Sequence, residues 1–188
     1  MAKFVRSLAA VLLFGVVGAC APTNTQIDYR YLNPSYNHQN FNSYLQGRDT
    51  RVVVVGDMLG LEPEAFGNAV TADMQGNNEG GPTNFTTHPT NAEPNFRVVM
   101  AFNAASYSNS LCEVKDLRPQ KTAGMTTLQA AWCWDNRMES YVSGRVAAVN
   151  PSDPKFKSLI AATTRELFPQ HMDPILQDDD FDSGDNFP

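Results

Sequence analysis

Three cysteines, at positions 20, 112 and 133, have the most distinctive chemistry in this sequence of 188 residues. Cys20 ends the stretch VVGAC, and before it Lys3 and Arg6 precede a run of about ten mostly apolar residues, 8–17. A positively charged start followed by a short apolar core is typical of a secretory signal peptide, and the core is too short to span a bilayer as a helix. We therefore expect residues 1–19 to be a signal peptide.

The four residues that end at Cys20 indicate how this thiol would be used. Val17-Gly18-Ala19-Cys20 resembles the lipobox of bacterial lipoproteins, in which a cysteine after an aliphatic and two small residues is acylated and becomes the mature N-terminus. The resemblance implies lipidation at Cys20; the alternative is an ordinary signal cleaved after Ala19, with Cys20 incidental. In that family an Asp after the cysteine commonly retains the protein in the inner membrane. Residue 21 is Ala, so the resemblance implies the periplasmic face of the outer membrane.

Cys112 and Cys133 remain as an even pair in a chain that we expect to reach an oxidising compartment, and they are therefore expected to form a disulfide. Closing a loop of this length would stabilise the fold by about 3 kcal/mol through the entropy of the unfolded chain. A pair of free buried thiols is the main alternative. A redox or metal site is a weaker one, because the sequence has no CxxC spacing.

Residues that could catalyse a reaction or bind a metal form no recognisable linear motif. His38, His88 and His171 belong to no HExxH, paired-His or Cys/His pattern, and the sequence has no GxSxG, SxxK or phosphate-binding glycine loop. We therefore expect no cofactor, no metal and no catalytic activity. Catalytic carboxylates that converge only in the folded chain would leave no such motif.

Two features could still form a site after folding. Trp132 and Trp134 alternate with apolar residues, a pattern that favours the core but could also present a ligand or partner face. Gly56 and Asp57 directly follow an apolar run, as active-site loops do in α/β folds. A turn before the next helix explains this pair at least as well.

Charge is concentrated at the C-terminal end. From Cys20 onward the chain carries 12 Lys and Arg against 20 Asp and Glu, and residues 170–188 hold six of the acids and no Lys or Arg. Phosphate binding needs clustered cations, so we expect no nucleic-acid partner.

Asp178, Asp180 and Asp182 have the spacing of calcium ligands, but Ser183 stands where the EF-hand needs Gly. Residues 170–188 are therefore predicted to be a disordered acidic tail.

The segment that follows the first cysteine is polar. Residues 20–47 are rich in Asn, Gln, Ser and Tyr, which predicts a lipidated N-terminus and a flexible tether that reaches about 30 Å. A plain spacer does not need aromatic side chains, so some of those in the tether could pack back on the domain or form a partner-binding strip. These are Tyr29, Tyr31, Tyr36, Phe41 and Tyr44.

A globular domain is predicted over residues 48–169. RVVVV (51–55) and FRVVMAFNA (96–104) predict two strands, separated by an amphipathic helix that ends at Gly76 and a polar loop over 77–95. A short strand is expected around 111–117. A second amphipathic helix begins after Asp153, its expected N-cap, and ends at Pro169.

Residues 126–149 predict a β-hairpin whose turn is Asp135-Asn136-Arg137. A three-residue turn would place Met138, Val142 and Val146 on the same face as Trp132, whereas a two-residue turn would pair Trp132 with Glu139. The apolar pattern favours the longer turn.

This order of elements predicts one two-layer α+β domain, in which two helices cover one face of a mainly antiparallel sheet.

The combined layout supports one further resemblance. The lipobox, the polar tether, the FRVVMAF strand, the Trp-containing hairpin and the final FKSLIAATTRELFP helix together resemble small α+β outer-membrane lipoproteins of Gram-negative bacteria whose function is unknown. Two functions are considered. The first is a non-catalytic structural or interaction module that is anchored to the membrane and contacts another envelope protein. The second is a lipoprotein that binds a small molecule or glycan on the face of the Trp-containing hairpin or on the loop over residues 77–95, with weak hydrolytic activity or none.

Overall fold

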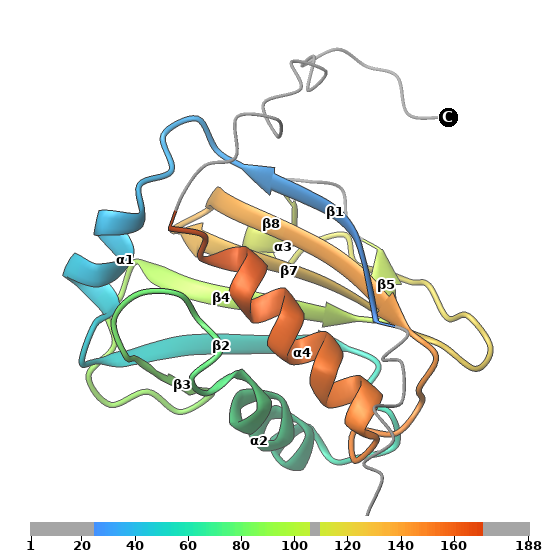
Figure 1. The fold of residues 1–188 in the computed structure, drawn as a ribbon. Helices are drawn as coiled ribbons and strands as arrows, with labels where there is room; N and C mark the ends of the chain where they lie inside the picture. The colour runs from blue at the N-terminus through green and yellow to red at the C-terminus, as the bar shows by residue number, and fades with distance from the viewer. Residues whose placement is uncertain (1–24, 106–109, 171–188) are drawn as a thin grey trace, which may run out of the picture.

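The computed structural model describes residues 25–105 and 110–170 (Figure 1). Its elements in chain order are β1 (Gln26–Leu32), α1 (His38–Leu45), β2 (Asp49–Gly56), α2 (Pro63–Met74), β3 (Asn84–Thr86), β4 (Phe96–Phe102), β5 (Ala104–Ala105), α3 (Ser110–Glu113), β6 (Arg118–Pro119), β7 (Thr126–Trp134), β8 (Arg137–Val146) and α4 (Pro154–Leu167).

Six of the strands form one sheet in the order β1-β8-β7-β4-β2-β3. The pairs β1–β8, β7–β8 and β4–β7 are antiparallel, but β2 is parallel to both β3 and β4. The α+β class is confirmed, whereas the sheet is mixed rather than mainly antiparallel. The reason is the long connection over residues 57–95, which carries α2 and returns the chain to the same end of the sheet, as a parallel pair requires.

The main hydrophobic core lies between the sheet and three helices, not two. Side chains of α1, α2 and α4 pack on one sheet face, where Figure 1 shows α4 crossing in front of the strands. A second, smaller cluster lies on the other face, where α3 covers Val99, Ala101 and Ala131. The segment around α3, which was expected to be a short strand, is thus a short helix.

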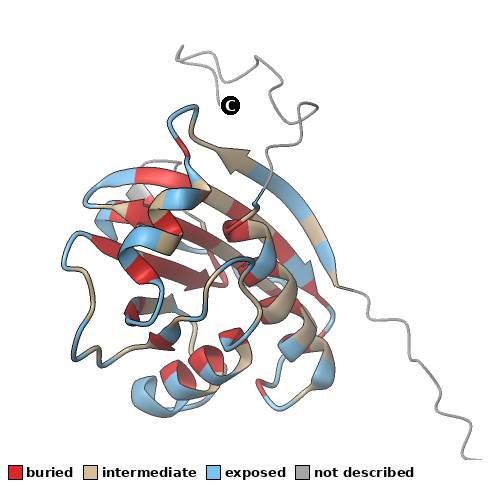
Figure 2. Ribbon diagram, turned by 60° about the vertical axis from the view of Figure 1, so that its left-hand side comes forward, coloured by how far each residue is buried: buried red, intermediate tan, exposed pale blue. Residues whose placement is uncertain are grey.

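The polar segment before residue 48 belongs to the domain and is not a tether from Gln26 onward. β1 pairs with β8 along its length, and α1 buries Phe41 and Leu45, which are 0% and 1% exposed. Figure 2 shows the inner side of α1 buried and most of β1 at the surface. Tyr36 is also buried, so the prediction that some aromatics pack back on the domain is confirmed. The predicted boundary at residue 48 is wrong, because three core side chains precede it.

Both predicted amphipathic helices are confirmed. Pro63 begins α2, which buries Phe66, Val70 and Met74. Asp153 is the N-cap of α4, and its side chain accepts a hydrogen bond from the backbone N–H of Lys155 (2.8 Å). A side-chain acceptor at this position satisfies a backbone donor that the helix itself cannot pair.

The predicted loop over residues 77–95 contains β3 and is organised by one carboxylate. Asp49 accepts hydrogen bonds from the backbone N–H of Thr90 (2.7 Å), the Thr90 hydroxyl (3.0 Å) and the Asn84 side-chain amide (2.7 Å). The backbone N–H of Asp49 in turn donates to the Asn91 side chain (2.7 Å). The start of β2 therefore holds this long loop in one conformation.

Several predicted features lie outside the described residues. These are the signal peptide, Cys20, His171 and the acidic tail beyond residue 170. Within the described ranges, no helix is long and apolar enough to span a membrane.

Candidate functional site

The tip of the β7–β8 hairpin brings together the tryptophans and cysteines that the sequence singled out. The turn has two residues, Asp135 and Asn136, because Trp134 pairs with Arg137. Further along, Cys133 pairs with Met138 but Trp132 pairs with Ser140, so the register shifts by one residue. The three-residue turn is therefore wrong: the turn is shorter, and a β-bulge restores the apolar register.

The bulge determines which face each side chain occupies. Trp132, Val142 and Val146 lie in the main core, as predicted, whereas Met138 lies with Cys133 in the smaller cluster on the other face. A slip of one residue in a strand moves a side chain to the opposite face. Glu139 is the extra residue of the bulge.

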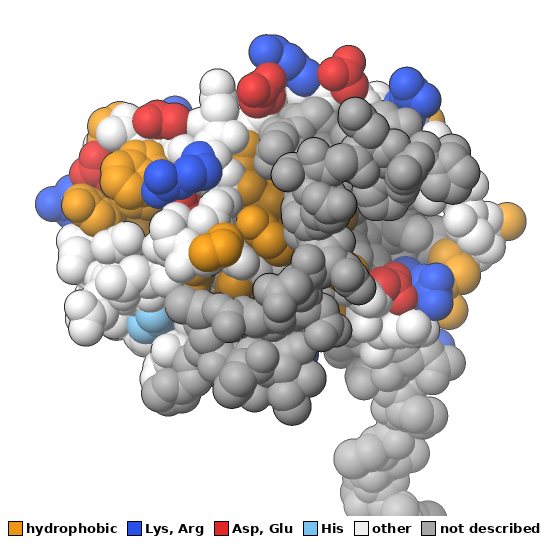
Figure 3. Space-filling model, turned by 90° about the horizontal axis from the view of Figure 1, so that it is seen from above, with side chains coloured by type: hydrophobic (Ala, Val, Ile, Leu, Met, Phe, Trp, Pro, Cys, Tyr) orange, Lys and Arg blue, Asp and Glu red, His pale blue; other side chains and the backbone are white. Residues whose placement is uncertain are grey.

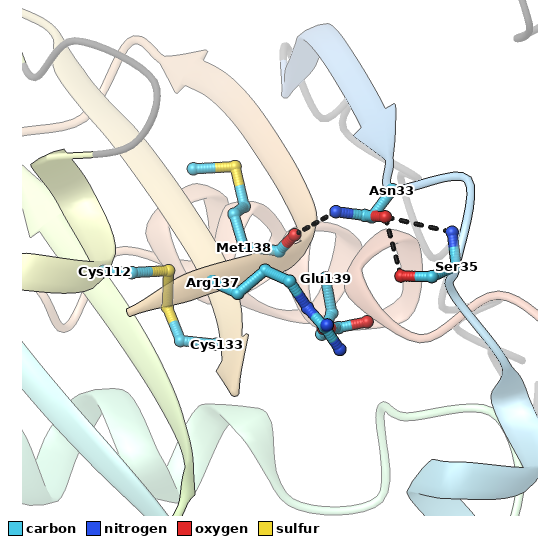
Figure 4. Close-up of polar contacts among 7 residues, drawn as sticks. All are labelled: Asn33, Ser35, Cys112, Cys133, Arg137, Met138 and Glu139. Carbon is cyan, nitrogen blue, oxygen red and sulfur yellow. Dashed lines mark hydrogen bonds and ion pairs between the residues drawn. A yellow bond between two sulfur atoms is a disulfide. The ribbon is translucent and has the colours of Figure 1, made fainter. Parts of the chain in front are cut away.

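Asn33, just after β1, donates hydrogen bonds to the backbone carbonyls of this bulge (Figure 4). Its backbone N–H donates to the carbonyl of Glu139 (2.9 Å), and its side-chain amide donates to the carbonyl of Met138 (3.0 Å). The Asn33 side-chain oxygen accepts from the backbone N–H and the hydroxyl of Ser35. Carbonyls at the irregular point of the β7–β8 ladder thus find donors, as buried backbone groups must.

Glu139 is a buried carboxylate, only 2% exposed. The Arg137 Nε donates to its Oε1 at 2.6 Å, and half of the Arg137 side chain remains exposed to solvent. The Arg137 guanidinium also lies 4.7 Å from the centre of the Trp134 ring. A buried carboxylate needs such a partner, because an unpaired one is costly in free energy.

The two tryptophans are not equivalent. Trp132 is 1% exposed, and Tyr36, Phe41, Phe96 and Phe168 surround it with ring centroids 5.5–6.3 Å away. The structure therefore places Trp132 in the core and not on a ligand or partner face.

Trp134 is half-buried, packing on Phe96 (5.5 Å) and carrying the Arg137 guanidinium over its ring. Its position at the hairpin tip leaves part of the ring at the surface. Trp134 is thus the one tryptophan that could still contact another molecule.

Cys112 and Cys133 form the predicted disulfide, which connects α3 to β7. Arg97 reinforces this connection: its Nη2 donates to the Cys112 carbonyl (2.6 Å) and to the Asn136 side chain (3.3 Å). The disulfide and Arg97 together attach α3 to the second face of the sheet. Sequence alone gave no signal for Arg97, because its partner is a backbone carbonyl.

The last residues that the structure describes, at the end of α4 and after it, are hydrogen-bonded to the region around Trp132. The Tyr36 hydroxyl donates to the carbonyl of Pro169 (3.0 Å), and the Ser140 hydroxyl donates to the carbonyl of Leu167 (2.6 Å). Burial raises the pKa of Tyr36, and the nearby carboxylates of Glu79 and Glu139 raise it further. The phenol therefore stays protonated and keeps its role as a donor.

Comparison with known proteins adds little to this geometry. The sequence matches no protein-family model, and no curated protein sequence is significantly similar to it. Among solved structures, the fold is similar to that of a leucine-to-methionine variant of PelC from Paraburkholderia phytofirmans, solved as a dodecamer. The two share 12% identity with a TM-score of 0.43, over 78% of this chain and 99% of PelC. A likeness at this level carries no functional argument.

Gly56 and Asp57, the other candidate, form a structural turn. Asp57 accepts from the backbone N–H of Leu59 (2.9 Å) and from the Asn103 side chain (3.3 Å), and it pairs with Lys121 (3.0 Å). The Lys121 ammonium and these hydrogen bonds lower the pKa of Asp57. A carboxylate held in its charged form by three partners fixes the turn that leads into α2.

The two histidines within the described ranges lie in different environments. His38 stacks on Phe41 and His88 is at the surface, and the described residues contain no group of three His, Cys, Asp or Glu that could hold a metal ion. Seen from above, charges of both signs are interspersed among the described side chains (Figure 3). The hairpin tip presents Trp134, Asn136 and Arg137 at the surface.

Proposed function

We propose that the protein is a lipoprotein of the bacterial envelope, anchored through Cys20 to the periplasmic face of the outer membrane. Its α+β domain is proposed to be a non-catalytic structural or interaction module that contacts another envelope protein. The VGAC sequence after a short signal peptide supports the anchor. The confirmed disulfide is consistent with export, because such bonds persist in oxidising compartments.

The observation that favours an interaction module over a ligand-binding protein is the burial of Trp132. The alternative function, binding of a small molecule or glycan, would use either the face of the Trp-containing hairpin or the long loop over residues 77–95. With Trp132 1% exposed and Arg137 lying over Trp134, that face is reduced to part of one ring. A protein partner can instead contact the exposed residues of the hairpin tip.

Fatty-acid labelling in cells tests the anchor. The wild-type protein should incorporate labelled palmitate and fractionate with the outer membrane, and Cys20→Ser should do neither. Ala21→Asp is the matched control: it should keep the label and move to the inner membrane, as the lipoprotein resemblance implies. A wild-type protein without label, or a Cys20→Ser protein that still carries it, would contradict the proposal.

Site-specific photo-crosslinking in intact cells tests the interaction. A photoreactive residue in place of Asn136, at the hairpin tip, should give one discrete protein adduct, and the adduct should disappear in a Cys20→Ser background. The same residue in place of Lys155, on α4 and far from the tip, is the control and should not give that adduct. No discrete adduct from position 136 would argue against a partner at the tip.

A further inference from the structure

The start of β1 fixes which end of the domain is nearest to Cys20. Only five residues separate Cys20 from Gln26, the first residue of β1. A fully extended chain spans at most about 3.3–3.6 Å per residue, so this connection reaches about 20 Å at most. This reach is shorter than the reach of about 30 Å expected for the tether from the sequence, because the residues of β1 and α1 belong to the domain.

The other elements that end beside Gln26 follow from the sheet register. Gln26 pairs with Arg145 near the end of β8, and Val146 pairs with Thr126 at the start of β7. Phe102 and Gly56, the last residues of β4 and β2, lie at the same end of the sheet. In Figure 1 this end is at the lower right, where β1 and α4 both begin.

Two large apolar side chains are exposed on the loops at this end. Val149 follows β8 and is 58% exposed, and Leu61 precedes α2 and is 42% exposed. The two loops lie on the same end of the core, because Phe66 in the first turn of α2 and Phe156 in the first turn of α4 have ring centroids 6.1 Å apart. Single exposed apolar side chains are common on protein surfaces, so these two indicate a contact only in combination with the anchor at the same end of the domain.

Both loops are held in place by hydrogen bonds. The Thr126 hydroxyl donates to the carbonyl of Ala148 (2.6 Å), which fixes the residue before Val149. The backbone N–H of Leu61 donates to the carbonyl of Met58 (3.0 Å). These hydrogen bonds hold the backbone next to both exposed side chains.

We infer that this end of the domain, with Leu61 and Val149 at its tips, rests against the lipid surface to which Cys20 is anchored. The inference rests on the lipidation proposed above. A weak apolar contact is sufficient, because the anchor holds the loops near the bilayer at an effective concentration on the order of millimolar. The hairpin tip and α1, at the opposite end of the sheet, then face away from the membrane.

Charges at this end predict how the contact responds to salt. Arg145 pairs with Asp28, and Lys121 pairs with Asp57, while Glu62 is an exposed acid next to Leu61. The charges are of both signs, so attraction to anionic lipid is not what positions the domain. We therefore expect the contact to persist in zwitterionic vesicles and to change little with added salt.

Hydrogen exchange measured by mass spectrometry tests the orientation. The chain from Cys20 onward is coupled through that thiol to a maleimide lipid in phosphatidylcholine vesicles, and the reference is the same chain with Cys20 capped by a small reagent. Amides at 57–62 and 147–150 should exchange severalfold more slowly on the vesicles, and amides at 39–45 in α1 should not change. The protection should be lost in a Leu61→Ser/Val149→Ser variant and kept in Tyr44→Ser, which alters an exposed side chain of α1.

The possible outcomes separate the two proposals, because chemical coupling does not depend on acylation in the cell. No protection at the two loops, or protection at α1 or at residues 110–119 instead, would overturn the orientation even if Cys20 is acylated. Protection at the loops together with an absence of palmitate labelling in cells would leave the orientation supported and overturn the anchor.

Discussion

Gly56 passes so close to Phe102 that a Cβ at position 56 would lie 2.2 Å from the Phe102 carbonyl oxygen. The same contact brings the backbone N–H of Asp57 to that oxygen at 2.9 Å. Gly56 also has φ +91°, a conformation that L-residues with side chains rarely adopt. The end of β2 is thus specified by the absence of a side chain.

Gly56→Ala should therefore be strongly destabilising. The backbone strain and the clash together should cost about 2–5 kcal/mol. Gly60→Ala is the matched control, because Gly60 has φ +83° but nothing within 4 Å of its ideal Cβ; it should cost about 1–2 kcal/mol. Urea unfolding of both variants measures the difference, and equal losses would show that the contact with Phe102 can relax.

Asp49 should make the domain sensitive to acid. The backbone N–H and side-chain donors around it lower its pKa from 3.8 to about 2. Because the folded-state pKa is the lower one, this contribution to stability is complete above about pH 4 and is lost as the pH falls toward 2. Asp49→Asn should be less stable at neutral pH and should lose less stability on acidification.

Urea unfolding at about pH 7 and about pH 3 measures this effect. Glu62→Gln is the control, since Glu62 is an exposed acid whose side chain makes no capping hydrogen bond. If acidification lowers the free energy of unfolding equally in the wild type and in Asp49→Asn, Asp49 does not cause the acid sensitivity.

Periodicity predicted the apolar elements well and the exposed ones poorly. β2, β4 and the two long helices bury continuous or amphipathic stripes, so their pattern is visible in the sequence. β1 is an edge strand with no buried residue among its seven, and its sequence QIDYRYL looks like a polar linker. Its place in the sheet depends on pairing with β8 and on Asn33, which no local pattern reveals.

The β-bulge and the parallel pair were missed for different physical reasons. The Trp132/Cys133 irregularity combines a two-residue turn with an extra residue at Glu139, so alternation alone indicated a longer turn. The parallel pairing of β2 and β4 could have been predicted, since a strand, a helix and a second strand separated by a long connection favour a parallel crossover. At the candidate site, the disulfide followed from cysteine counting. The Arg137–Glu139 pair did not, because two opposite charges two residues apart give no indication in the sequence that the carboxylate is buried.

The disulfide should contribute to stability and be closed in the mature protein. Without reductant, an alkylating reagent should label neither Cys112 nor Cys133, because the two are joined. Cys112→Ser/Cys133→Ser should lower the free energy of unfolding by about 3 kcal/mol. Cys20→Ser is the control and should leave it unchanged; rapid labelling of both cysteines in the wild type would contradict the pairing.

The C-terminal boundary of the domain should lie between Phe168 and Gln170. Phe168 is fully buried, with its ring 4.6 Å from Phe41, and the backbone N–H of Gln170 donates to Glu79 (3.1 Å). A chain that ends at Gln170 keeps these contacts and should melt within a few degrees of the full-length protein.

A chain that ends at Leu167 loses the Phe168 ring, which should cost about 3–5 kcal/mol. Phe168→Ala in the full chain should show a similar loss, so that the effect of the side chain is separated from the effect of length. A large drop in melting temperature for the chain ending at Gln170 would mean that residues beyond it stabilise the fold.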